Sequence, residues 1–283
     1  MNRIFLIKKG WTYVFFGILL VFLLACGKKS IESKINVEKT PDQGDEKENV
    51  IEKSLDEILK DYKLIWQDEF EGAFLDKSKW KYRAEGSVRQ YATVSSRTIS
   101  LDGNGNLVIT VEKEEGKYYV GQVCTDGLFQ SKYGYYECRA KMNKSIGPHV
   151  AFWLQSNTMG NENDNPAENG AEVDIFEYHK KTSNQIHHNI HWNGYGTGHK
   201  QEGTKVFIDD IEKGFHTFGL LWTDKEYVFY VDGKEMWRTS KGLSKISEYI
   251  ILSTELTGFG GDPSQGTYPD SVVFDYVRVY QPK

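Results

Sequence analysis

From Trp66 onwards, apolar and polar residues alternate in short runs that predict β-strands separated by turns. Apolar side chains fall on every second position over 107–111, as in a strand with one buried face. The apolar run 228–230 leads into Asp232-Gly233, which favours a hairpin because type I′ turns need positive φ angles, and residues 236–237 begin the return strand. Many short strands with turns between them predict an all-β sandwich or barrel.

The last apolar run, over 272–280, predicts a closing strand with regular alternation. One of its faces would carry Val272, Phe274, Tyr276, Arg278 and Tyr280, and the other Val273, Asp275, Val277 and Val279.

A helical pattern precedes the strands. Between Val50 and Leu64, the spacing of Ile51, Leu55 and Ile58 predicts a short helix. This helix either leads into the folded domain or packs on the sandwich. The stretch 27–49 is polar, charged and without aromatic residues, so it cannot bury much surface and is interpreted as a tether.

The amino terminus predicts a targeting segment over residues 1–25, in which Arg3, Lys8 and Lys9 precede an apolar run that is short for a membrane-spanning helix. The run ends in Leu23-Leu24-Ala25-Cys26, which resembles a bacterial lipobox. The resemblance implies cleavage before Cys26 and a diacylglycerol on its sulfur, with residues 26–63 tethering the domain 64–283 to the cell membrane or outer membrane. An uncleaved membrane anchor is the alternative. Both interpretations place the domain outside the cytoplasm.

Three acids in the middle of the chain, Glu172, Asp174 and Glu177, are the strongest indication of chemistry. The surrounding stretch 171–178 is rich in strand-forming residues, so Glu172 and Asp174 share a face. Regular alternation would send Glu177 to the opposite face, but a β-bulge at Ile175-Phe176 would return it.

Grouped carboxylates on a half-buried strand repel one another, a cost that is more often tolerated for chemistry than for packing. Two carboxylates that flank a glycosidic bond are the usual machinery of glycoside hydrolysis. A solvated acidic strand edge, paired with lysines such as Lys180 and Lys181, is the alternative.

The acidic strand resembles the signature of glycoside hydrolase family 16. Six further segments resemble strands of that family in the same order, at Trp66–Phe70, Leu107–Thr110, Tyr133–Lys141, Ala151–Leu154, Phe215–Gly233 and Phe274–Tyr280. The resemblance covers about residues 64–281. It implies a β-jelly-roll sandwich, similar to concanavalin A, with an open substrate cleft on its concave sheet.

The resemblance also implies a retaining, two-step hydrolysis that needs no cofactor. Glu172 is the expected nucleophile, Glu177 the acid/base and Asp174 the helper between them. Retaining geometry places the two glutamate carboxyl groups roughly 5–5.5 Å apart. We expect the pKa of Glu177 to be raised because Glu172 is ionised beside it.

The strand 186–192 places His187, Asn189 and His191 on one face. The family resemblance pairs this strand with the acidic one, so this face would hydrogen-bond sugar hydroxyls or the acids. A metal site is the competing hypothesis, but two residues four apart on a strand lie about 13 Å from each other. His188 and His216 are expected to be structural.

Trp153 matches the cleft tryptophan of the family. Alternation places it opposite Phe152 and Leu154, which would face the core. Trp222 and Trp237 are weaker candidates for sugar stacking, and core packing is favoured for each.

Cys124 and Cys138 are expected on two strands joined by a turn near 131–132. That register sets them diagonally, which is poor geometry for a disulfide, so two free buried thiols are favoured over a bridge. The resemblance further implies a structural calcium ion held by Asp275, the carbonyl of Gly105 and backbone near Glu69. A paired or capping Asp275 is the alternative.

The substrate is less well defined. The chain departs from the familiar glucanase pattern at 147–150, 87–91 and 253–261, so a β-1,3-glucan or mixed-linkage glucan is expected by frequency. No basic cluster indicates a sulfated substrate, although Arg83, Arg89 and Lys180 would contribute to one. A galactan-directed hydrolase, a transglycosylase and a sugar-binding lectin remain alternatives. The net charge of −5, without a long basic block, does not favour nucleic acid. A monomer is assumed.

Overall fold

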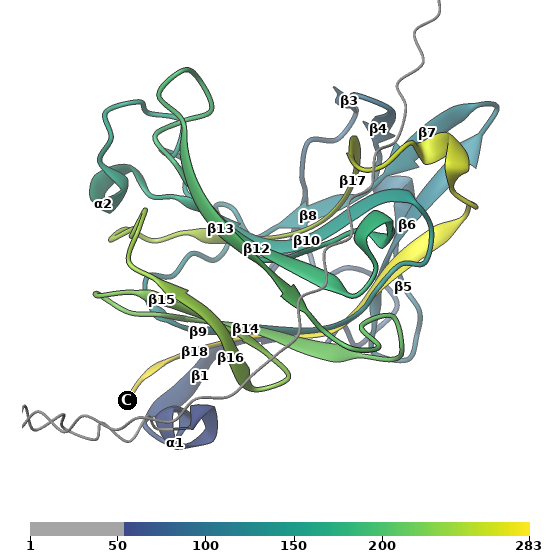
Figure 1. The fold of residues 1–283 in the computed structure, drawn as a ribbon. Helices are drawn as coiled ribbons and strands as arrows, with labels where there is room; N and C mark the ends of the chain where they lie inside the picture. The colour runs from purple at the N-terminus through teal and green to yellow at the C-terminus, as the bar shows by residue number, and fades with distance from the viewer. Residues whose placement is uncertain (1–53) are drawn as a thin grey trace, which may run out of the picture. The chain divides into compact units, whose positions relative to one another are not determined.

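The computed structural model describes residues 54–283. The predicted signal segment, Cys26 and most of the predicted tether lie outside the described residues. Two sheets face each other in this part of the chain (Figure 1). The arrangement is the β-jelly-roll sandwich that the sequence predicted.

One sheet has 11 strands in the order β16-β15-β14-β9-β18-β6-β7-β4-β3, with β1 paired to β18 and β5 to β6. Their bounds are β1 Tyr62–Asp68, β3 Val88–Arg89, β4 Ala92–Val94, β5 Ile99–Leu101, β6 Leu107–Glu114, β7 Lys117–Val120, β9 Gly134–Lys141, β14 His216–Trp222, β15 Tyr227–Val231, β16 Lys234–Thr239 and β18 Asp270–Pro282.

The other sheet has 7 strands in the order β13-β12-β11-β10-β17-β8-β2. Their bounds are β2 Lys81–Tyr82, β8 Gln122–Cys124, β10 Gly147–Gln155, β11 Glu172–Tyr178, β12 Gln185–Trp192, β13 Lys200–Phe207 and β17 Tyr249–Gly260. The helices are short: α1 Leu55–Leu59, α2 Pro166–Asn169, and the 3₁₀ turns η1 Ser96–Thr98, η2 Lys180–Thr182 and η3 Pro263–Gln265. None of the helices in the described range is long and apolar enough to cross a membrane.

The core lies between the sheets because their strands alternate inward apolar and outward side chains. Phe152 and Phe176 come from the seven-stranded sheet, and Phe218 and Trp222 from the other; all four are fully buried. The rings of Phe176 and Phe218 meet across the interface at 4.1 Å. An aromatic pair of this kind contributes roughly 0.5–1.5 kcal/mol beyond its buried area.

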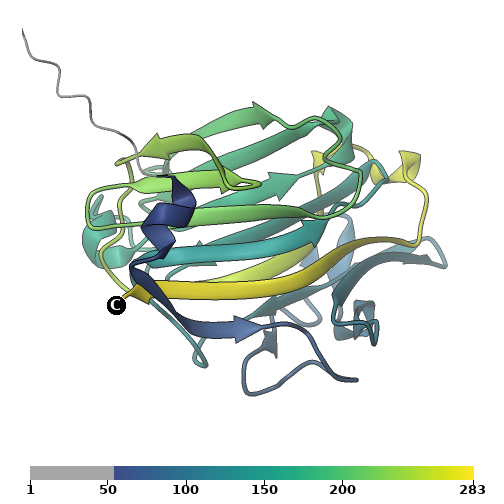
Figure 2. The same cartoon turned by 90° about the horizontal axis from the view of Figure 1, so that it is seen from below.

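The predicted helix before the strands is α1. Its amino end has a capping box in which Ser54 and Glu57 satisfy each other's backbone N–H groups. Leu55 packs with Leu221 and Val228 on the outer face of the 11-stranded sheet, where α1 lies across the strands (Figure 2). Of the two alternatives, the structure therefore shows the packed helix. β1 begins at Tyr62, four residues before Trp66, where the strand pattern was expected to begin.

The predicted hairpin at Asp232-Gly233 is confirmed, since both residues have positive φ angles, of 50° and 73°. The regular alternation predicted for the last strand is wrong. The pairing of β18 with β9 shifts between Phe274 and Tyr276, so Asp275 is a bulge residue. As a result Phe274 and Val277 both face the core.

The two cysteines are free and buried, as favoured by the sequence. The hairpin that was expected to join their strands is wrong. Cys124 lies on β8 of the seven-stranded sheet, whereas Cys138 lies on β9 of the other.

Candidate active site

A pocket of about 350 Å³ lies on the outer face of the seven-stranded sheet. Alternate residues of β10 line it, and the residues between them belong to the core. The neighbouring strands β11 and β17, the segment after β2 and the loop after β12 complete the wall. The lining residues are Arg83, Arg89, His149, Ala151, Trp153, Gln155, Glu172, Asp174, Glu177, Tyr195, Ser253 and Glu255.

β11 contains the bulge that the sequence predicted. Asp174 pairs with Trp153 of β10, but Phe176 pairs with the adjacent Phe152, so Ile175 is the extra residue. Ile175 and Phe176 both enter the core. Glu177 therefore returns to the face of the other two acids, and all three line the pocket.

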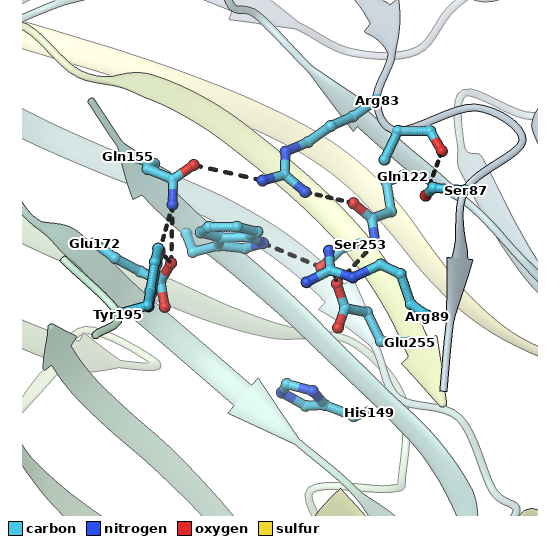
Figure 3. Close-up of polar contacts among 12 residues, drawn as sticks. Arg83, Ser87, Arg89, Gln122, His149, Gln155, Glu172, Tyr195, Ser253 and Glu255 are labelled. Atoms are coloured by element: carbon cyan, nitrogen blue, oxygen red, sulfur yellow. Dashed lines mark hydrogen bonds and ion pairs between the residues drawn. The ribbon is translucent and has the colours of Figure 1, made fainter. Parts of the chain in front are cut away.

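Glu172 is held by two donors on the same carboxylate oxygen. Gln155 Nε2 donates to Glu172 Oε2 at 3.0 Å, and the Tyr195 hydroxyl donates to the same atom (Figure 3). Burial raises the pKa of Glu172, and the Tyr195 hydroxyl and His191 offset this only in part. The carboxylate thus has a fixed orientation at the mouth of the pocket.

Asp174 lies between the two glutamates along the strand and is the most enclosed of the three acids. Its Oδ2 lies 3.4 Å from His191 Nε2. Burial raises the pKa of Asp174 well above its usual range, and the charges of Glu177 and Glu172 raise it further. Asp174 is therefore expected to hold a proton, which reduces the repulsion among the three acids.

Glu177 contacts two partners. His149 Nε2 lies 2.7 Å from Glu177 Oε1, and Asn189 donates to the other oxygen. Burial alone would raise the pKa of Glu177, but His149 and Asn189 outweigh burial and lower it. The raised pKa that the sequence predicted for Glu177 is therefore wrong, because an imidazole that was not anticipated faces the carboxylate.

The predicted polar face of β12 points to the acids, although none of its three residues lines the pocket itself. Asn189 contacts Glu177 and His191 contacts Asp174. His187 pairs with Glu177 along the strands, and its ring packs 5.3 Å from that of Phe259. His188 is structural as expected, because its Nδ1 lies 2.7 Å from the Ile175 carbonyl oxygen in the core.

Trp153 lines the pocket as predicted, with Nε1 donating to Ser253 Oγ at 3.0 Å. Trp222 is fully buried, and Trp237 packs against the core and stacks on Phe229 at 5.0 Å. Both match the expected core packing. His216 lies away from the pocket lining, with Nδ1 2.7 Å from Asp232 Oδ2.

Several pocket residues were missed from the sequence. Gln155 follows Trp153 by two positions, so strand alternation was a usable signal for it. His149 was available too, since it lies in the segment 147–150 where the chain departs from the glucanase pattern. No sequence pattern indicated Tyr195, because it lies in an irregular loop after β12, where residues do not alternate as they do in a strand.

The start of β11 rests on a buried acid. Glu248 Oε1 accepts a hydrogen bond from the Ala171 N–H at 2.9 Å. The preceding Gly170 has a φ of 79°, and a side chain there would collide with Ser156. Burial raises the pKa of Glu248 to about 8. Glu248 thus anchors the backbone directly before Glu172.

The expected calcium residues lie beside the middle of β18. Asp68 pairs with Val277 and Leu107 with Phe274, so the segments at Glu69 and Gly105 continue beside Asp275. The Asp275 carboxylate is paired with Arg139, a cation that would compete with a calcium ion. This donor set fits calcium only in part, and the calcium ion stays a prediction.

A second group of metal-ligand type overlaps the acids. Ligand atoms of Glu172, Asp174 and His191 all lie within 4.8 Å of one another. His187 is not in this group, so the two-histidine site considered from the sequence does not form.

Grouped carboxylates in an open pocket of a jelly-roll sandwich are the arrangement expected of a glycoside hydrolase. The model of glycosyl hydrolases family 16 matches residues 87–277, and the chain belongs to that family.

Named relatives agree with this assignment. The chain is 24% identical to glucan endo-1,3-beta-glucosidase A1 of Niallia circulans, over 85% of this chain and 41% of that protein. It is 29% identical to keratan-sulfate endo-1,4-beta-galactosidase of Sphingobacterium multivorum, over 78% of this chain and 56% of that protein. The chain thus spans about half the length of these relatives.

Among solved structures, the catalytic domain of an endo-1,3-beta-glucanase (laminarinase) from Thermotoga petrophila RKU-1 superposes with a TM-score of 0.68. The match has 26% identity and covers 79% of this chain and 99% of that one.

Proposed function

We propose that the chain is a retaining endo-β-glycanase that hydrolyses β-1,3- or mixed-linkage β-1,3(4)-glucan. The observation that carries this proposal is the bulged strand β11, which directs Glu172, Asp174 and Glu177 into one open pocket. The glucanase relatives support the glucan assignment. A pocket open on a sheet face admits an internal segment of a long chain, which favours endo cleavage.

In the first step, Glu172 Oε attacks the anomeric carbon while the leaving glycosidic oxygen takes a proton from Glu177. This step breaks the glycosidic bond and forms a glycosyl ester on Glu172. In the second step, Glu177 removes a proton from water, and the resulting hydroxyl attacks the anomeric carbon and releases Glu172. Gln155 and Tyr195 hold Glu172 in line throughout.

The proton that the first step needs is held by His149 and Glu177 together. Burial alone would lower the pKa of His149, but the Glu177 carboxylate outweighs burial and raises it. In the free protein the last dissociable proton of the pair therefore lies on His149. We propose that it moves across the 2.7 Å contact to Glu177 when substrate displaces water from the pocket. Asp174, which has a carboxylate oxygen within 4.8 Å of one of Glu172, serves as the helper residue beside the nucleophile.

The stereochemistry of the first product tests this mechanism. Proton NMR of laminarin digestion, followed from the first seconds, should show the β-anomer before mutarotation. Initial appearance of the α-anomer would show inversion and would exclude Glu172 as the nucleophile.

A galactan-directed hydrolase is the second candidate. The 29% identical relative named keratan-sulfate endo-1,4-beta-galactosidase supports it. In the pocket, the Arg83 guanidinium lies over the Trp153 ring at 4.9 Å and occupies one face of that ring. Digestion of keratan sulfate and of laminarin side by side separates the two candidates.

We also propose that Cys26 carries a lipid anchor, on the strength of the lipobox-like sequence ending at that residue. Labelling cells that express the wild type or Cys26→Ala with radioactive palmitate tests this. The wild type should incorporate the label and the variant should not; an unlabelled wild type, or equal labelling of both, would contradict lipidation at Cys26.

A further inference from the structure

Two arginines from the segment after β2 line the pocket, and their charges are used differently (Figure 3). Arg89 is paired with a carboxylate, since its Nη1 lies 2.7 Å from Glu255 Oε1. Arg83 instead donates to two neutral amide oxygens, from Nη1 to Gln122 Oε1 at 2.7 Å and from Nη2 to Gln155 Oε1 at 3.4 Å.

We propose that Arg83 forms a subsite for an anionic substituent, a sulfate ester or a carboxylate, on the sugar that binds beside Glu172. This inference rests on the proposed glycanase function. Because unsubstituted glucans carry no anionic group, it favours the second candidate substrate class, a galactan that bears such groups.

Within the described residues no carboxylate lies within ion-pair distance of Arg83, and the carboxylates of Glu172 and Asp126 interact with its charge only from farther away. Its side chain is half-buried, and a partly desolvated cation without a counter-ion costs stability. A guanidinium has five N–H donors in a planar fork, and that fork matches the oxygens of a sulfate or carboxylate. An anionic ligand group would supply the missing partner.

The surroundings hold Arg83 in place for such a ligand. Its backbone N–H donates to the Gln122 carbonyl at 3.0 Å, and its guanidinium packs over the Trp153 ring. The turn that follows is closed by Ser87, whose hydroxyl donates to the Ala84 carbonyl at 2.7 Å. Ordering costs on binding are reduced when the recognising group is held before the ligand arrives.

The distribution of charge in the pocket restricts where an anion can bind. The catalytic acids lie on β11, and Glu255 on β17 is near Arg89, so an anionic group would be repelled from most of the wall. The Arg83 side is the exception. Gln155 joins Arg83 to Glu172, with its amide oxygen accepting from Arg83 and its amide nitrogen donating to Glu172. The substituent would therefore sit on the sugar next to the nucleophile.

Arg83 could instead serve only as a clamp that holds Trp153 and Gln155. The two roles differ in a measurable way. A clamp supports every substrate equally, so its loss weakens binding of neutral and anionic polysaccharides by the same factor. An anion subsite changes the ratio between them.

The test measures binding by isothermal titration calorimetry in the Glu172→Gln background, which prevents turnover. The probes are two matched pairs: keratan sulfate with its chemically desulfated form, and laminarin with laminarin oxidised to carry carboxylates. Arg83→Gln removes the charge, Arg83→Lys keeps the charge without the fork, and Arg97→Gln is a control on a surface arginine paired with Glu114.

At least one anionic polymer should bind about tenfold more tightly than its neutral parent, the ratio expected for one charge-assisted contact. If keratan sulfate binds more tightly than its desulfated form, the recognised group is a sulfate; if oxidised laminarin binds more tightly than laminarin, it is a carboxylate. Arg83→Gln should abolish the ratio, Arg83→Lys should keep part of it, and Arg97→Gln should keep all of it. Added salt should reduce it.

The proposal is contradicted if neither anionic polymer binds more tightly than its parent, or if the ratio survives in Arg83→Gln. The result is separable from the proposed function, which wild-type reducing-end release reports. A binding ratio without hydrolysis would keep the subsite and reject the hydrolase.

Discussion

The contact between His149 and Glu177 changes how proton donation must be understood at this site. The imidazole and the carboxylate lie 2.7 Å apart and share their protons as one unit. Other titratable groups face this unit: Asp174 and Glu172 on β11, His179 after it, His191 and His187 on β12, and Glu255 on β17. The pair loses its last proton at a higher pH than Glu177 would beside a neutral side chain, because either partner can hold that proton.

His149→Gln should therefore move the alkaline limb of kcat/KM to lower pH. The wild-type limb reflects the His149–Glu177 pair, in which the pKa of His149 is raised above 6.5. In the variant the proton resides on Glu177 alone and leaves at a lower pH. The measurement is the pH dependence of kcat/KM on a soluble polysaccharide substrate, with His216→Gln as the control because His216 pairs with Asp232 away from the pocket.

The opposite shift would contradict this account. If His149 stayed charged and only lowered the pKa of Glu177, its removal would move the alkaline limb to higher pH. An unchanged limb would remove His149 from the proton pathway altogether.

At the scale of elements, the acidic strand β11 is fixed at its start by a buried carboxyl group. Glu248 is fully buried and accepts from the Ala171 N–H, while its Oε2 has no hydrogen-bond partner among the described residues. Its pKa is raised to about 8 from 4.5. Between these values the unfolded chain releases the proton while the folded protein retains it, so stability falls as pH rises from about 4.5 to 8.

Glu248→Gln should remove this dependence, because an amide has no proton to release and its oxygen can still accept from Ala171. At pH 7 the variant should have a free energy of unfolding about 3 kcal/mol higher than the wild type, because each pKa unit between 4.5 and pH 7 contributes about 1.36 kcal/mol. This difference should vanish near pH 4.5. Urea unfolding at several pH values measures it, with the exposed Glu71→Gln as control. A variant that is destabilised equally at every pH would show that Glu248 is ionised in the folded protein.

The elements also show what the sequence could and could not predict. The hairpin at Asp232-Gly233 and the bulge at Ile175 were predictable, since local turn chemistry signals the first and the spacing of acids on one face signals the second. The bulge at Asp275 was not predictable, because the segment that contains Phe274 and Val277 has the same pattern of residues as a straight strand with regular alternation. Cys124 was placed in a hairpin with Cys138 because neighbouring strands in sequence often pair, whereas here the chain crosses between sheets.

At the scale of the whole molecule, the site depends on segments that are far apart in the sequence. The acids and Trp153 were predictable because they lie on strands with a strong pattern. Arg83 and Tyr195 come from irregular segments, and only the tertiary fold brings them to the pocket on the seven-stranded sheet. Their role depends on tertiary structure, for which strand periodicity carries no signal.

The central claim is that this fold cleaves a β-linked polysaccharide with the acids of β11. The most direct test measures the release of reducing ends by residues 54–283, which are the described part of the chain. The substrates are laminarin, lichenan, xyloglucan, agarose, carrageenan and keratan sulfate. Glu172→Gln serves as the blank. The account predicts release from at least one polysaccharide and a loss of at least about a thousandfold in the variant, as expected when a nucleophile is removed. No release from any of them, with binding retained by one, would contradict hydrolysis and favour a lectin.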